Sequence, residues 1–199
     1  AAHISLESLV ILGDAILTAI ARKPGLANDR TADGIYQDFV RQVTGLPKFN
    51  AKSKCMIALA FITPRVDSPM ESKTRIATTK YGLPPAVTNY TVPGATFSNG
   101  APITLDLAWP EFRVAIEYDG DHHRTDKNQW RRDNDKRELL RHHHWIIIIA
   151  TAANMADEPS QAELAYRVGR QLALRGAVFD FTLTATPLDE LARRRRRRI

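Results

Sequence analysis

The chain has 199 residues, of which 44% are hydrophobic and 25% charged, a composition ordinary for a globular protein with one main core. The formal net charge of +6 would suggest a polyanionic partner, but six consecutive arginines at 193–198 supply all of it. Without those six, Lys plus Arg falls from 28 to 22 and equals Asp plus Glu at 22. The rest of the chain is therefore neutral, and any other basic surface must come from local segregation of charge.

The single cysteine, Cys55, excludes an internal disulfide and favours a reducing, cytoplasmic compartment. No activating neighbour is visible beside it, so a small packed hydrophobe is a better interpretation than a nucleophile. The longest apolar run, residues 145–153, is about half of the ~20 residues that a membrane-spanning helix needs. We therefore expect no membrane span, and the sequence shows no secretory signal.

Residues 1–63 predict an N-terminal helical region. Apolar side chains recur at helical spacing from about residue 5 and stop at Lys23-Pro24-Gly25. Two further helices are expected at about residues 32–43 and 51–62. None of the three carries clustered His, Cys or acidic residues. We expect these helices to pack together or to bind a partner protein or a larger assembly.

The segment Ser68-Pro69-Met70-Glu71 has two interpretations. In the structural one, Ser68 is the N-cap of a helix, Pro69 takes the first helical position, and Glu71 reaches back to a free backbone amide. In the functional one, Glu71 is a catalytic acid at the start of a helix that lies under a sheet. The local sequence is compatible with both.

Residues 103–119 predict a β-hairpin with one apolar and one acidic face. A turn at residues 110–113 sets a register in which Asp106 faces Glu117 and Thr104 faces Asp119. Like charges directly opposite each other destabilise a sheet, and this face of the hairpin carries no cation. The three carboxylates Asp106, Glu117 and Asp119 therefore predict a divalent cation, Mg²⁺ or Mn²⁺.

Carboxylates about 5–7 Å apart can hold Mg²⁺, with waters and a substrate phosphate completing the octahedron. Such a metal activates water and stabilises charge on a phosphoryl group. A glycosidase would need aromatic sugar platforms, and a zinc site would need His and Cys ligands at suitable spacing. His122 and His123 are adjacent and point in different directions in an extended segment. One of them exchanges a proton or contacts phosphate, or both are ordinary surface residues.

A charged helix is expected from about residue 125 to 142. Its basic residues alternate with acids, which predicts either a solvated face with i,i+4 pairs or a face that contacts phosphates. The nucleic-acid contacts in the second case are Arg131, Arg132, Lys136 and Arg137.

Residues 145–149 then predict a strand buried inside the sheet beside the hairpin, and residues 160–174 predict a last helix. Residues 142–144 are three histidines, which we place at the end of a surface helix. Residues 181–199 read as a basic C-terminal tail, mobile from Asp189 on. The tail either attracts a polyanion or keeps the chain soluble, and its arginines are Arg193, Arg194, Arg195, Arg196, Arg197 and Arg198.

Several short motifs follow one another in this chain: Ser-Pro-Met-Glu, Gly-Leu-Pro-Pro, Leu-Asp-Leu-Ala-Trp-Pro, Val-Ala-Ile-Glu-Tyr-Asp-Gly, Arg-Arg-Asp and Trp-Ile-Ile-Ile. In this order they resemble actinobacterial proteins that carry a very-short-patch-repair-like endonuclease domain, within the PD-(D/E)xK nuclease superfamily. The resemblance covers about residues 64–176. Residues 1–63 are similar to the helical region that precedes that domain.

The resemblance implies an α/β fold over residues 64–180: a restriction-endonuclease-like, mixed four-stranded sheet flanked by helices. It implies a metal held by Asp106 and Glu117, with Glu71 adding a helix-borne acid. Asp119 stands where the superfamily pattern usually has Lys. Asp119, His122 or His123 would therefore take part of the role of the cation that orients the water.

Two functions follow as expectations. The first is a Mg²⁺-dependent DNA endonuclease. The second is a catalytically inactive nuclease-fold module that binds nucleic acid or a nucleoprotein assembly such as the ribosome or nucleoid. The missing Lys and the arginine tail favour the module, and the unrelieved acidic face favours the enzyme.

Overall fold

The computed structural model describes the backbone of residues 3–120 and 127–196, and the side chains of that part except at 127–134, 195 and 196. The chain divides into two compact units. Residues 1–76 and 186–199 form what we call the helical unit, and residues 77–185 form the sheet unit. The division falls inside helix α5 (Pro69–Lys80), beyond the predicted boundary at residues 63 and 64.

The helical unit confirms the predicted helices. It contains α1 (Leu6–Ala21), the short α2 (Pro24–Ala27), α3 (Ala32–Gly45) and α4 (Lys52–Leu59). Ser5 and Thr31 cap α1 and α3, and each side-chain oxygen accepts a backbone N–H from the first turn. Within the described part of the chain, no helix has the length and apolarity to cross a membrane.

A buried ion pair ties α1 to the first part of α5. The Asp14 carboxylate, 1% exposed, lies 2.6 Å from Arg75 Nη2 and accepts hydrogen bonds from Ser72 Oγ and from the backbone N–H of Thr63. Burial raises the pKa of Asp14, and Arg75 with these hydrogen bonds opposes the shift. Because every partner lies in the helical unit, the network fixes how these helices pack.

Ser68 and Glu71 form the predicted helix cap. The Glu71 backbone N–H donates to Ser68 Oγ at 3.2 Å, and the Asp67 backbone N–H donates to Glu71 Oε2 at 2.9 Å. The Glu71 side chain thus reaches one residue further back than in the standard capping box. Glu71 belongs to the helical unit, and its catalytic role stays a prediction.

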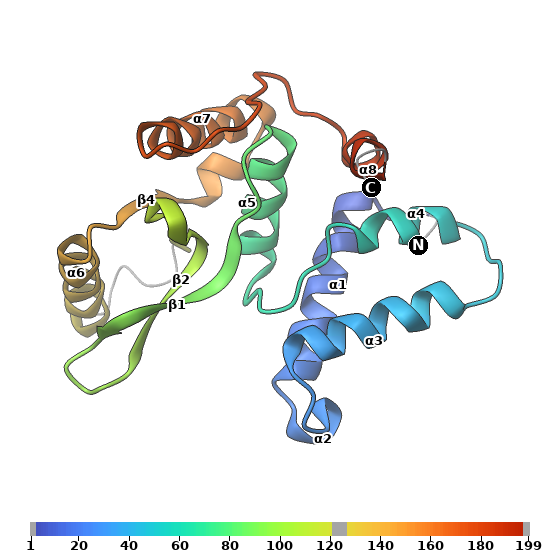
Figure 1. Ribbon diagram of the computed structural model, residues 1–199, viewed down its shortest axis with the longest axis horizontal. Coiled ribbons are helices and arrows are strands. Elements are labelled where there is room, and N and C mark those ends of the chain that lie inside the picture. Colours follow the sequence, from blue (N-terminus) through green and yellow to red (C-terminus); the bar gives the residue numbers. More distant parts are fainter. Residues whose placement is uncertain (1–2, 121–126, 197–199) are drawn as a thin grey trace. The chain divides into compact units, whose positions relative to one another are not determined.

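The sheet unit contains a mixed four-stranded sheet in the order β1-β2-β3-β4. The strands are β1 (Val87–Thr96), β2 (Pro102–Trp109), β3 (Val114–Tyr118) and β4 (Ile146–Ala150). Strands β1, β2 and β3 pair antiparallel, and β4 runs parallel to β3 (Figure 1). Pairing of Leu107 with Ile116 and of Trp109 with Val114 confirms the predicted register.

Residues 145–149 were predicted to form a strand inside the sheet, and the predicted place in the strand order is wrong. Strand β4 lies beside the hairpin as expected, but at the edge of the four described strands. Ile148 is buried, whereas Ile147 and Ile149 are half-buried. The apolar run is explained by helices that contact it, α6 (Lys127–His142) and α7 (Glu158–Leu174), which lie on different sides of the sheet (Figure 1).

The helices of the sheet unit bury the faces that their spacing predicts. Leu164, Val168 and Leu172 of α7 are fully buried, and Leu140 of α6 packs into a cluster with Trp145. Gly82, at φ +85°, ends α5, where a Cβ would overlap the carbonyl oxygen of Asp180.

The prediction of a mobile tail from Asp189 on is wrong for the described residues 189–196. Residues Leu188–Arg196 form a helix, α8, in the helical unit. Leu188 and Ala192, one turn apart, are 4% and 3% exposed and join the core formed by α1, α3 and α4. The arginine run masked this short apolar stripe, because only two or three of its positions are apolar.

We predict that Leu188→Ala lowers the free energy of unfolding by about 2–4 kcal/mol, since it leaves a cavity in the helical core. The matched control is Leu183→Ala, at a residue 81% exposed, which should change stability by less than about 0.5 kcal/mol. Urea denaturation followed by circular dichroism measures both. Equal, small effects would show that α8 does not pack as described.

Candidate metal centre

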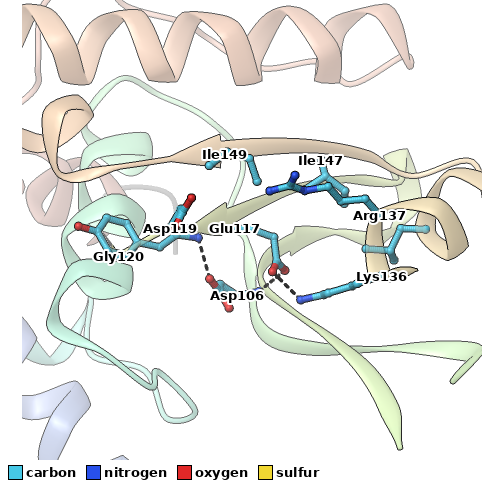
Figure 2. A pocket seen from close by; sticks show the side chains of 10 residues that line it. Asp106, Glu117, Asp119, Gly120, Lys136, Arg137, Ile147 and Ile149 are labelled. Atoms are coloured by element: carbon cyan, nitrogen blue, oxygen red, sulfur yellow. Dashed lines mark hydrogen bonds and ion pairs between the residues drawn. The ribbon is translucent and has the colours of Figure 1, made fainter. Parts of the chain in front are cut away.

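A pocket of about 260 Å³ lies between the sheet and α6. It is next to the end of the β2–β3 pairing, where Leu107 pairs with Ile116. Its lining combines acids, bases and apolar side chains (Figure 2): Asp106, Glu117, Tyr118, Asp119, Gly120, Lys136, Arg137, Leu140, Ile147 and Ile149. Glu117 and Ile149 are partners in the parallel register, so both belong to the sheet face that α6 covers. The predicted acidic face is therefore a half-enclosed pocket.

The carboxylates of Asp106 and Glu117 each accept a hydrogen bond from the backbone of the neighbouring strand. The Asp106 backbone N–H donates to Glu117 Oε1 at 3.3 Å, and the Tyr118 backbone N–H donates to Asp106 Oδ2 at 2.8 Å. Each carboxylate thus accepts a backbone N–H from the opposite strand. These bonds position both carboxylates and offset part of the repulsion between them.

The acidic face has a cationic partner, which corrects the view that it lacks one. Lys136 Nζ of α6 lies 2.5 Å from Glu117 Oε2, and the two side chains are only 20% and 19% exposed. Lys136 was predicted to lie either on a solvated helix face or on a face that contacts nucleic acid, and the nucleic-acid contact stays a prediction. The sequence could have predicted this contact with Glu117, because Lys136 and the apolar Leu140 are four residues apart and so share one face of the helix. A helix that buries Leu140 therefore turns Lys136 toward the sheet.

Glu117 is the titratable group most clearly perturbed in this pocket. Burial raises its pKa, and the nearby Asp106 charge raises it further. Lys136 and the Asp106 N–H act in the opposite direction, and the resulting pKa is about 7. Near neutral pH the Glu117 carboxylate is therefore partly protonated, and a bound divalent cation would displace that proton.

The other predicted site residues are placed as follows. Asp119 lines the same pocket, is exposed, and donates its backbone N–H to the Ala150 carbonyl oxygen at 2.8 Å. Arg137 also lines the pocket. His122 and His123 lie outside the described residues, as do the side chains of Arg131 and Arg132.

The arginines of α8 are only partly described. Arg193 and Arg194 form ion pairs with Asp189 and Glu190 one turn earlier. The side chains of Arg195 and Arg196, and residues Arg197 and Arg198, fall outside the described part. Their contacts to nucleic acid stay predictions.

The donor set fits Mg²⁺ or Mn²⁺ better than a metal that needs a complete protein cage. Within residues 3–120 and 127–196, the structure brings no group of three or more His, Cys, Asp or Glu into a metal-holding arrangement. Mg²⁺ is commonly held by one or two carboxylates, with waters and substrate phosphates supplying the other ligands. Asp106 and Glu117 meet that requirement, and Asp119 stands at the edge of the same pocket.

Two uncharacterized proteins of Mycobacterium tuberculosis are similar to this chain: MT2308 of strain CDC 1551 / Oshkosh and Rv2248 of strain ATCC 25618 / H37Rv. Each is 30% identical over 114 residues, which is 57% of this chain but 40% of the relative. No family model and no solved structure matches the chain. The chain thus aligns with less than half of these relatives, and the similarity assigns neither a family nor an activity.

The raised pKa of Glu117 predicts how stability depends on pH in the absence of metal. The folded state holds the proton more tightly than the unfolded chain, so this contribution to stability is complete below about pH 4.5 and is lost as pH rises through about 7. The loss should be on the order of 1–3 kcal/mol. Urea denaturation in EDTA at several pH values measures it.

Glu117→Gln is the matched control, because the amide keeps the shape and does not titrate. The difference in unfolding free energy between wild type and this variant should change between pH 4.5 and 7. A constant difference over that range would contradict the raised pKa.

Proposed function

We propose that this chain is a Mg²⁺-dependent endonuclease that hydrolyses phosphodiester bonds in DNA, with a restriction-endonuclease-like domain of the very-short-patch-repair type. The observation that carries the proposal is the convergence of Asp106, Glu117 and Lys136 in one pocket, with Arg137 at its wall. Two carboxylates can hold a metal that activates water and stabilises charge on a phosphoryl group, and a nearby lysine can add to that stabilisation. The motif order along the sequence supports the same reaction.

Asp106 and Glu117 are the proposed metal ligands. Their orientation is set by the backbone N–H groups of Tyr118 and Asp106, so the carboxylates need little reorganisation on binding. A bound Mg²⁺ or Mn²⁺ would lower the pKa of a water molecule and stabilise charge on the phosphoryl group. Asp119 would assist by accepting a hydrogen bond from a water at the pocket edge.

Lys136 is the proposed replacement for the lysine that Asp119 displaces from the motif. Its ammonium group reaches the carboxylate pair from α6 rather than from β3. From there it can neutralise charge on the phosphoryl group or donate to the attacking water. His122 or His123 would exchange a proton or contact phosphate from the segment that follows β3.

The charge of the pocket fits a phosphodiester backbone. Three carboxylates face one lysine and one arginine, so the lining carries a net charge of about −1 when all are ionised. A divalent cation and one phosphodiester anion would bring this total to zero. Arg137, with Arg131 and Arg132 on the same helix, would hold the backbone without reading base sequence.

We predict that the wild-type chain nicks plasmid or mismatched duplex DNA in Mg²⁺ or Mn²⁺, and that Asp106→Ala lowers the rate at least about hundredfold through loss of a metal ligand. Gel electrophoresis of supercoiled plasmid measures this. Glu111→Gln is the matched control, because Glu111 is an exposed acid in the β2–β3 turn and does not line the pocket. Equal cleavage by wild type and Asp106→Ala would refute the assignment.

A specific observation favours the second candidate, a non-catalytic module that binds nucleic acid or a nucleoprotein assembly. Lys136 already neutralises Glu117, so the carboxylate pair has a protein counter-charge without a metal. Such a pocket could be purely structural, and binding would then rely on α8 and the N-terminal helices. Isothermal calorimetry separates the two functions, since the module predicts no Mg²⁺ or Mn²⁺ binding that is lost in Glu117→Gln.

If the arginine run contacts phosphates, deleting residues 193–198 should reduce the slope of log affinity against log salt by up to about 5. Fluorescence anisotropy with labelled DNA and RNA, between about 50 and 200 mM salt, measures the slope. Leu188 and Ala192 remain in the deleted chain, and its melting temperature shows whether the helical core persists. An unchanged slope would remove the arginine run from the binding surface.

A further inference from the structure

The Glu117 carboxylate has a partner on each oxygen. Oε1 accepts the Asp106 backbone N–H, and Oε2 is in contact with the Lys136 ammonium group at 2.5 Å. Both side chains are about four-fifths buried, so this ion pair is little screened by solvent. The ammonium group therefore occupies one of the two oxygens through which the Glu117 carboxylate would hold a metal.

A divalent cation that binds Glu117 Oε2 would compete with this ammonium group. Mg²⁺ binds carboxylate oxygens at about 2.1 Å, so a Mg²⁺ ion on Oε2 would lie at most about 4.6 Å from the Lys136 ammonium group in its present position. At such a distance, in a pocket with reduced dielectric screening, repulsion between them is strong. Metal binding at this oxygen would therefore weaken the contact between Lys136 and Glu117, and the contact would weaken metal binding.

We infer that Lys136 is the resident cation of the metal-free pocket, and that its ammonium group leaves Glu117 when a divalent cation binds. The inference rests on the proposed function, because it assumes that Asp106 and Glu117 bind metal. Lysine suits this exchange, since its charge sits on a flexible four-carbon stem with rotatable bonds. Released from Glu117, the ammonium group stays within reach of the pocket and becomes a donor to a phosphate oxygen.

The lysine therefore sets the metal affinity. Without divalent cation it supplies a counter-charge to two half-buried carboxylates whose repulsion would otherwise be costly. In exchange, each metal-binding event must break the Lys136–Glu117 contact. Metal binding and phosphate binding then favour each other, since metal frees the donor that phosphate uses.

The test compares Lys136→Gln with Arg137→Gln in Mn²⁺ titrations followed by electron paramagnetic resonance and calorimetry. Both variants remove one positive charge from the pocket lining, but only Lys136 contacts Glu117 in the described structure. Glutamine is polar and about one bond shorter than lysine, so it removes the charge without placing an apolar or larger group in the pocket. We expect Lys136→Gln to bind Mn²⁺ about tenfold or more tighter than wild type, and Arg137→Gln to change affinity by less than about threefold.

The outcomes separate the inference from the proposed function. Wild-type Mn²⁺ binding that Glu117→Gln abolishes supports the metal site. Equal gains in the two charge variants, or weaker binding by Lys136→Gln, would overturn the inference and leave the metal site intact. Binding by Lys136→Gln alone would support the inference, and no binding by any of these proteins would overturn both ideas.

A second measurement needs no substitution. Acetylation of lysines by a small amine-reactive ester, quantified by mass spectrometry, reports how available each ammonium group is. Lys136 should react several-fold faster when Mg²⁺ is present, while the exposed Lys73 should not change. A Lys136 rate that is unaffected by saturating Mg²⁺ would show that the ammonium group does not leave Glu117.

Discussion

Two carboxylates that face each other across β2 and β3 are the constraint on which the sheet unit depends. Asp106 and Glu117 repel each other, and the structure offsets this with two cross-strand N–H donors and the Lys136 ammonium group. Burial, and after it the Asp106 charge, still raise the pKa of Glu117 to about 7 against these stabilising contacts. A fold that keeps such a pair gives up stability there, which is typical of sites that bind or react.

The sequence predicted the hairpin well because strand periodicity and turn chemistry are local. Alternating apolar residues with a turn at 110–113 allow one register that buries the apolar face, and the structure has that register. Helices α1, α3, α4 and α7 were predicted for the same reason, since each shows its own apolar spacing. Only the ends of these elements move, by at most three residues, at the end of α4.

The errors all concern contacts between segments far apart in sequence. Strand β4 reads as a central strand, yet its place at the edge depends on which strand pairs with it. The sequence of helix α8 resembles a charged tail. Leu188 and Ala192 attach it to the protein only because they pack into the core of α1, α3 and α4. Lys136 is one basic residue among several in its helix until α6 packs on the sheet. Local patterns carry none of this information.

The cation of this pocket comes from helix α6 and not from the strand that carries Glu117. A lysine at position 119 would be held by the same backbone segment that carries Glu117, so its distance from Asp106 and Glu117 would hardly vary. A lysine on α6 depends on how that helix lies on the sheet, and Leu140, one turn later, is its buried anchor. Any partner that shifts α6 would therefore alter the contact between Lys136 and Glu117. The position of α6 and the electrostatic environment of Glu117 are therefore coupled through the Lys136 side chain.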